Sequence, residues 1–211
     1  MHLVSWEIIK RPISEGGLNI RDPELVNLPL GGKLLWQSYS NKNHPVSKIF
    51  RKKYLKGIPM RNINSANSPK GTSIWNLCRR GLDNFQLQLY RIPGSGKRTL
   101  LWEDKIMGNL PFSSNESLSE IKDWLSNKGF LRLRNIFSWD RAGNWVGWSF
   151  PDIPDYLIPQ QNMLVLSLTS CAPVNCFLKD GWGWGSTSNY SVALGFKAIQ
   201  LTLDSRIPPA I

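Results

Sequence analysis

The sequence has few of the residues that most often carry chemistry. Of its 211 residues, 3 are cysteines and 2 are histidines. The three cysteines cannot all pair with one another, and Cys171 and Cys176 lack the second pair of ligands that a zinc site needs. We therefore expect free thiols, no metal site and no cofactor.

Long apolar runs are also missing. The longest, Met163 to Leu166, has 4 residues, far short of the roughly 20 that a membrane-spanning helix needs. The N-terminal residues lack the layout of a secretory signal peptide. We therefore expect an intracellular protein, in the nucleus or the cytoplasm, with no membrane partner.

Carboxylate pairs suited to catalysis are scarce as well. Glu103 and Asp104 form the one pair inside a recognisable motif. Adjacent residues of a strand point to opposite faces, so these two side chains would not hold a metal together. His2 and His44 lie far in sequence from any cysteine or paired aspartate, which gives no nucleophile and base. We predict that the chain is not an enzyme by itself.

Positive charge is what the sequence does have, and it is unevenly placed. The net charge is +11, and residues 1–105 carry 18 Lys and Arg against 7 Asp and Glu, whereas residues 106–211 carry 8 against 8. A one-sided basic field attracts polyanions, so RNA or DNA is the predicted partner, with solubility alone as the alternative. The predicted contact residues are Lys48, Arg51, Lys52, Lys53, Lys56, Arg79, Arg80, Lys97 and Arg98.

Two helices are predicted before residue 57. The first begins with Asp22 as its N-cap and Pro23 at its first position, and Pro29 kinks or splits it. The second, residues 46–56, is basic and amphipathic. Its predicted apolar face holds Val46, Ile49, Phe50 and Tyr54.

A Gly-Ser-Gly turn at residues 94–96 predicts a β-hairpin, with strands at 87–92 and 99–102. The pair Gly96-Lys97 also invites comparison with a phosphate-binding loop. That loop has the pattern Gly-x-x-x-x-Gly-Lys-Ser/Thr, and this chain has Arg91 and Arg98 at the two deciding positions. The pattern therefore argues against a nucleotide loop.

Further elements are predicted on both sides of this turn. Short helices are expected at 72–82, at 114–128 with a capping box at Ser117 and Glu120, and after Ser191. Residues 162–168 fit either a strand or a buried helix, and periodicity alone does not decide between them. A second hairpin is expected at 182–190. The predicted class is α+β, mainly short helices with two small β-hairpins and much irregular structure. The predicted division is a basic helical segment at 1–57, a linker at 58–72 and a hairpin-and-helix domain at 73–211.

Aromatic residues add a second interpretation of the surface. Trp139, Trp145 and Trp148 could stack on bases, but aromatic side chains near turns favour the role of hydrophobic anchors. The same three residues could instead contact a protein partner.

Short motifs follow one another over nearly the whole chain, and no one of them is a catalytic signature. They are Val4–Glu7, Pro12, Gly16–Leu18, Asn27, Leu30, Lys33, Trp36, Lys53-Tyr54, Ser73–Trp75, Gly94–Lys97, Leu101–Asp104, Gly108, Trp139-Asp140, Gly143–Trp145, Trp148, Asp180, Trp182, Trp184, Tyr190–Val192 and Gly195-Phe196. In their order and spacing these motifs resemble plant LINE-type (non-LTR) retrotransposon reverse transcriptases, in the segment between the thumb and the zinc-binding region. In the setting of this resemblance we prefer a helix at 162–168.

The chain also departs from that family. It has Pro29 and Gly31 where the family usually has Ala and Leu, and Lys10 where the family has Cys. The polymerase aspartates belong upstream of this segment and the zinc motif downstream, and neither is in the sequence. The resemblance therefore implies a truncated, non-catalytic accessory fragment that binds nucleic acid. The alternatives are a remnant recruited as a protein-interaction or regulatory protein, and a product with no selected function.

Overall fold

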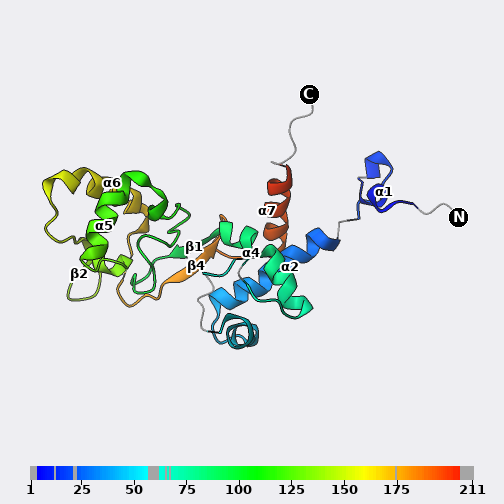
Figure 1. The fold of residues 1–211 in the computed structure, drawn as a ribbon, viewed down its shortest axis with the longest axis horizontal. Coiled ribbons are helices and arrows are strands. Elements are labelled where there is room, and N and C mark those ends of the chain that lie inside the picture. Colours follow the sequence, from blue (N-terminus) through cyan, green and yellow to red (C-terminus); the bar gives the residue numbers. More distant parts are fainter. Residues whose placement is uncertain are drawn as a thin grey trace, which may run out of the picture. The chain divides into compact units, whose positions relative to one another are not determined.

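The computed structural model describes residues 4–11, 13–20, 23–56, 62–64, 66, 68–173 and 175–204. The chain divides into two compact units (Figure 1). The first unit comprises residues 1–87 and 190–211, and the second unit comprises residues 88–189. Mostly short helices and two small antiparallel sheets make up the described structure, which confirms the predicted α+β class.

The first unit is helical. Its core consists of large side chains from α2, α3, α4 and α7, with Trp36, Phe50, Trp75, Leu82 and Phe85 among those buried. Helices α4 and α7 both pack against α2. The helices are α1 (Trp6–Lys10), α2 (Pro23–Ser40), α3 (Pro45–Phe50) with the π-helical segment Arg51–Leu55 after it, α4 (Ser73–Leu87) and α7 (Val192–Asp204), and a 3₁₀ turn spans Ile13–Glu15.

Helix α2 begins at Pro23, as predicted, but it continues through Pro29 to Ser40. The helix is therefore not split there, and a kink at Pro29 stays a prediction. The predicted N-cap Asp22 lies outside the described residues. Close packing explains why the helix continues despite the roughly 3 kcal/mol cost of an internal proline. A Cβ atom added at Gly31 would lie 3.2 Å from Cα of Cys78 on α4, and one added at Gly32 would lie 2.3 Å from the hydroxyl oxygen of Tyr190. The two glycines let α2 approach its neighbours.

The second unit combines irregular chain with short elements around a continuous apolar core. Leu101, Trp102, Ile121, Leu133 and Leu164 are among its fully buried residues. Its elements are β1 (Leu89–Ile92), α5 (Ser119–Asn127), β2 (Phe137–Trp139), β3 (Trp145–Trp148), α6 (Ile158–Leu168) and β4 (Gly181–Trp184), with 3₁₀ turns at Phe112–Ser114, Glu116–Leu118, Leu133–Ile136, Asp155–Leu157 and Thr169–Cys171.

The sheets differ from the two predicted hairpins. Strand β1 pairs antiparallel with β4, so that Leu89 lies opposite Trp184 and Ile92 opposite Gly181. Neither the hairpin predicted around Gly94–Gly96 nor the one predicted at 182–190 forms, because each supplies one strand to this long-range pair. The local hairpin is instead β2–β3, in which Phe137 lies opposite Trp148.

Helix termini show a second difference. The predicted capping box at Ser117 and Glu120 is absent from α5, whose N-cap is Leu118 without a side-chain hydrogen bond. Asn115 accepts the Ser117 N–H at 3.1 Å instead, and so caps the preceding 3₁₀ turn. The other predicted cap is confirmed: the Ser191 hydroxyl accepts the N–H of Leu194 at 3.2 Å at the start of α7. The helix predicted at 162–168 is confirmed as part of α6.

The predicted linker at 58–72 lies partly outside the described residues, so the predicted domain limits stay a prediction. Helix α4 follows that segment and packs against α2, which precedes it, so the first unit contains chain from both sides. No helix among the described residues is long and apolar enough to cross a lipid bilayer.

Candidate nucleic-acid interface

The basic segment at residues 45–56 is a short helix with well-defined ends. Pro45 stands at the first helical position, and Nδ1 of His44 accepts the Val46 N–H at 3.3 Å. A proline loses no helical hydrogen bond at that position, and a capping side chain satisfies one exposed donor. The π-helical segment ends at Lys56, whose backbone adopts the left-handed conformation with φ of 43°.

Three aromatic rings attach this segment to α4. The ring of Tyr54 stacks on Trp75 with centroids 4.5 Å apart, and Phe50 meets Trp75 edge-on at 4.9 Å. The Tyr54 hydroxyl lies 2.8 Å from Oγ1 of Thr72, and the Trp75 indole N–H donates to the Pro69 carbonyl at 2.7 Å. These rings hold one side of the segment, so its cations lie on a fixed scaffold.

One residue of the predicted apolar face is misplaced. Phe50 and Tyr54 are buried and Val46 is half-buried, whereas Ile49 is 55% exposed. The buried face is centred on Ser47, Phe50 and Tyr54, because the Ser47 hydroxyl donates to the Gln37 carbonyl at 3.0 Å and rotates the helix toward α2. Ile49 lies beyond the edge of that face.

The structure places the seven predicted basic residues of the first unit on two packed elements. Lys48, Lys52, Lys53 and Lys56 are exposed, and Nζ of Lys53 lies 5.5 Å from the centre of the Tyr54 ring. Arg51 is half-buried. Arg79 on α4 is half-buried one helical turn after Trp75, and Arg80 is exposed.

The charge difference between the two units is larger than the difference between the sequence halves. The first unit contains 16 Lys and Arg against 6 Asp and Glu, a net charge of +10. The second unit contains 10 against 9, a net charge of +1. Predicted contact residues Lys97 and Arg98 lie in this nearly neutral second unit.

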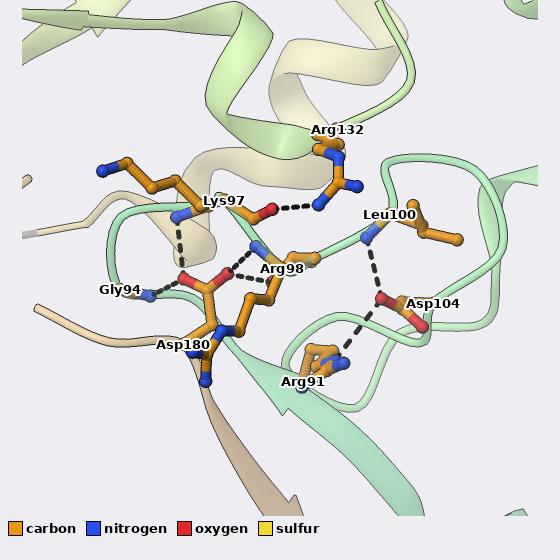
Figure 2. Close-up of polar contacts among 10 residues, drawn as sticks. Arg91, Gly94, Lys97, Arg98, Leu100, Asp104, Arg132 and Asp180 are labelled. Atoms are coloured by element: carbon orange, nitrogen blue, oxygen red, sulfur yellow. Dashed lines mark hydrogen bonds and ion pairs between the residues drawn. The ribbon is translucent and has the colours of Figure 1, made fainter. Parts of the chain in front are cut away.

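Lys97 and Arg98 project from a glycine loop, residues 94–99, which is closed around one carboxylate (Figure 2). Asp180 accepts the backbone N–H groups of Gly94 at 2.9 Å, Gly96 at 2.7 Å and Arg98 at 2.6 Å. The Thr99 hydroxyl donates to the same carboxylate at 3.1 Å. Gly96 has φ of 70°, a conformation that favours glycine. The loop thus resembles an anion-binding nest whose anion belongs to the protein itself.

A second carboxylate braces the turn that follows. Asp104 accepts the Leu100 N–H at 2.7 Å, and its Oδ2 lies 3.4 Å from Nε of Arg91. The Arg91 guanidinium carbon lies 3.5 Å from the ring centre of Trp182, the residue opposite it on β4. Arg91 is 9% exposed and Asp104 6%. Asp104 therefore braces the turn, and Arg91 is committed to an internal contact.

Sequence reasoning missed the residues that complete this region. Arg132 and Arg134 come to the glycine loop from the 3₁₀ turn before β2. The Arg132 guanidinium donates to the Lys97 carbonyl, and the backbone N–H of Arg134 donates to the Gly96 carbonyl at 3.1 Å. Lys179 precedes Asp180, and its carbonyl carbon would lie 2.7 Å from a Cβ added at Gly94. Nothing in the local sequence pattern brings these residues to residues 94–99.

The tryptophans of the β2–β3 hairpin pack on the core of the second unit. Trp139, Trp145 and Trp148 are partly buried against it, and the rings of Trp145 and Trp148 lie 5.5 Å apart. The turn between the strands is closed by Asp140, whose pKa is lowered by the hydrogen bond from the Asn144 N–H. This packing agrees with the role of hydrophobic anchors.

No three His, Cys, Asp or Glu side chains among the described residues are placed to hold a metal ion. The cysteines are free thiols, as predicted. Burial raises the pKa of Cys78 to about 12 and also raises the pKa of Cys171, which keeps both thiols protonated at neutral pH. That the chain is no enzyme stays a prediction.

Comparison with known proteins gives one distant relative, an Arabidopsis thaliana protein that bears the name "Putative ribonuclease H protein". The two are 24% identical over 217 residues, which cover 96% of this chain and 31% of the relative. No protein-family model matches the chain, and no solved structure matches it. The chain thus spans less than a third of the relative's length and is similar, at this distance, to a plant ribonuclease H protein, a similarity typical of retrotransposon-derived sequences.

Proposed function

We propose that this chain is a non-catalytic, nucleic-acid-binding accessory segment of a reverse transcriptase of the LINE (non-LTR) retrotransposon type. The observation that carries the proposal is the group of exposed lysines Lys48, Lys52 and Lys56 on α3, the π-helical segment and its end, in a segment fixed by aromatic packing and a unit of net charge +10. Cations on a fixed main chain contact a phosphate backbone without the entropic cost of ordering that main chain.

The distant relative supports the same class of partner. A ribonuclease H, as the relative is named, acts on RNA, and the alignment covers nearly the whole of this chain. The charge pattern is of the kind that gives sequence-independent, salt-sensitive binding, because phosphate contacts carry no base information. We therefore expect binding to single-stranded RNA and DNA with little sequence preference.

The test is fluorescence anisotropy of the full chain with a labelled single-stranded RNA of about 20 nucleotides. Each contact to a single strand contributes about −0.7 to the slope of log K against log salt, and hence about a fivefold factor at 0.1 M salt. The Lys48→Gln/Lys52→Gln variant should bind about 25-fold more weakly, with a slope shallower by about 1.4.

The matched control is the double variant Lys128→Gln/Arg141→Gln, which removes two exposed cations from the second unit. It should bind as the wild type does, within about threefold. If the wild-type chain binds neither RNA nor DNA at low salt, or if its affinity does not fall as salt is added, the proposal is wrong. A protein partner would then be the hypothesis to test.

A further inference from the structure

The second unit carries its own concentration of charge. Five of its ten Lys and Arg residues lie on the glycine loop or come to it from other segments. These five, which we name the loop cluster, are Lys97, Arg98, Arg132, Arg134 and Lys179. Four of the five are exposed, and Arg134 is half-buried.

Two carboxylates of the region already have partners within the protein. The Asp180 carboxylate is enclosed by four donors of residues 94–99, and Asp104 lies against Leu100 and Arg91. With one internal carboxylate against five cations, the loop cluster has a local charge of about +4 in a unit whose total is +1. The remainder of the second unit is therefore net acidic, and a polyanion that approaches this unit is attracted to the loop cluster.

From this we infer that the loop cluster is a second contact site for a nucleic-acid phosphate backbone, and that Asp180 is the residue that positions it. The inference rests on the proposed function and adds a site in the other unit. A small free anion is a poor match, because the backbone N–H groups of Gly94, Gly96 and Arg98 are occupied by Asp180. What remains for a ligand is a set of cationic side chains, which suits the repeating charges of a phosphodiester chain.

The positioning role follows from the hydrogen bonds. Four bonds to one carboxylate, together with the Arg132 contact to the Lys97 carbonyl, hold the loop backbone from opposite sides. Lys97 extends away from the carboxylate (Figure 2). An ordered loop presents its cations without a further entropic cost on binding. Asp180 thus supplies order rather than charge, because its own negative charge opposes a polyanion.

The first experiment compares two variants of the full chain in the anisotropy assay. Arg98→Gln/Lys179→Gln removes one arginine and one lysine from the loop cluster, and Lys128→Gln/Arg141→Gln removes the same two residue types elsewhere in the unit. All four side chains are exposed, so neither variant disturbs the core. The loop-cluster variant should bind about 25-fold more weakly, with a slope shallower by about 1.4, and the control should not. Equal affinities for the two variants would overturn the inference.

The second experiment uses Asp180→Asn. For this variant, loss of loop order predicts weaker RNA binding, whereas loss of the negative charge predicts tighter binding. The substitution removes one negative charge, so a purely electrostatic surface would bind RNA more tightly. An amide, however, has one acceptor oxygen, and its NH₂ group would face an N–H donor of the loop. We expect binding at least threefold weaker than wild type, with faster hydrogen exchange at residues 94–99. Unchanged or tighter binding would refute the positioning role.

The outcomes separate the two proposals. A wild-type chain that binds no nucleic acid ends both. Suppose that the wild-type chain binds RNA, that Lys48→Gln/Lys52→Gln weakens binding, and that the loop-cluster variant binds as tightly as the control variant. This outcome refutes only the second site. Inorganic phosphate at matched ionic strength should not compete with RNA, and competition would show that the loop cluster takes a small anion instead.

Discussion

The two units expose cations by different physical means. In the first unit, the lysines of residues 45–56 stand on the short helix α3 and the π-helical segment after it, whose other side is held by the rings of Phe50, Tyr54 and Trp75. In the second unit, cations from separate stretches of chain meet at a glycine loop that is held by the carboxylate of Asp180. Apolar burial is non-directional, whereas a carboxylate in a nest fixes each backbone N–H. The comparison predicts a tolerant first surface and a geometrically strict second one.

The same contrast holds for stability. The basic segment of the first unit depends on a few large aromatic contacts, and the glycine loop of the second unit depends on buried carboxylates that accept from backbone donors. A substitution should therefore act mainly within its own unit. Hydrogen–deuterium exchange followed by mass spectrometry resolves the two units in the full chain, and the following changes break or sharpen the comparison.

Trp75→Ala should have the largest effect. Trp75 is 1% exposed, stacks on Tyr54 and donates to the Pro69 carbonyl. Removal of a buried tryptophan costs about 3 to 5 kcal/mol. Exchange should accelerate throughout α3, the π-helical segment and α4, and RNA affinity should fall with it. Trp75→Phe, which keeps an aromatic ring, should cost less than half as much. Equal acceleration in both units would contradict their separate packing.

Asp104→Asn should rank second and act in the second unit. It leaves the 9% exposed Arg91 guanidinium without its carboxylate, and breaking a buried pair in this way costs about 3 kcal/mol. Chemical denaturation and exchange at residues 89–106 measure the loss. The neighbouring exposed residue provides the control, because Glu103→Gln should change stability by less than about 0.5 kcal/mol. If Asp104→Asn leaves the free energy of unfolding unchanged, the Arg91–Asp104 pair does not brace the loop.

Tyr190→Phe should cost about 1 kcal/mol in the first unit. The Tyr190 hydroxyl donates to the Pro29 carbonyl at 2.7 Å inside α2, and the substitution removes this bond. The ring contact with Phe85, 5.6 Å between centroids, remains. Thermal unfolding measures the change. Tyr190→Ala, which removes the ring as well, should cost several times more, and similar losses for the two variants would show that the ring contributes little.

A rise to pH 9 should have the smallest effect. Burial raises the pKa of Cys78 to about 12, so above pH 9 the unfolded chain loses this proton more readily than the folded one. The stability contributed by this group is thus complete well below pH 9. It is lower by about 0.5 kcal/mol at pH 9 itself and declines further as the pH rises toward 12. Burial also raises the pKa of Tyr190, which adds a loss of the same sign above pH 10. Cys78→Ala should show a shallower decline near pH 9, and an unchanged decline would exclude the thiol as its source.

The elements that sequence patterns predicted well are those whose signal is local. Helices α4 and α7 follow from apolar spacing, and Ser191 from the short-range chemistry of an N-cap. The exposed lysines of residues 45–56 follow from the same helical spacing. Such features depend on residues within a turn or two of one another, which a linear pattern contains.

The elements that were predicted wrongly depend on distant partners. The stretch at residues 87–92 favours a strand, but its partner is β4, about ninety residues later, rather than the chain just after the Gly-Ser-Gly turn. The glycines that predicted a hairpin instead allow the backbone to wrap around Asp180. Helix α2 crosses Pro29 because Gly31 and Gly32 give it close neighbours. Packing outweighed local preference in each case.

By itself the sequence determined the charge asymmetry, the α+β class and the exposed cations of one helix, because charge and helical periodicity need no partner to be visible. Only the tertiary structure decided that the glycine loop encloses Asp180 and that Arg132, Arg134 and Lys179 join Lys97 and Arg98. The physical reason is that a carboxylate can satisfy backbone donors from any point in the chain. That choice depends on how the β1–β4 pair and the core of the second unit bring the segments together.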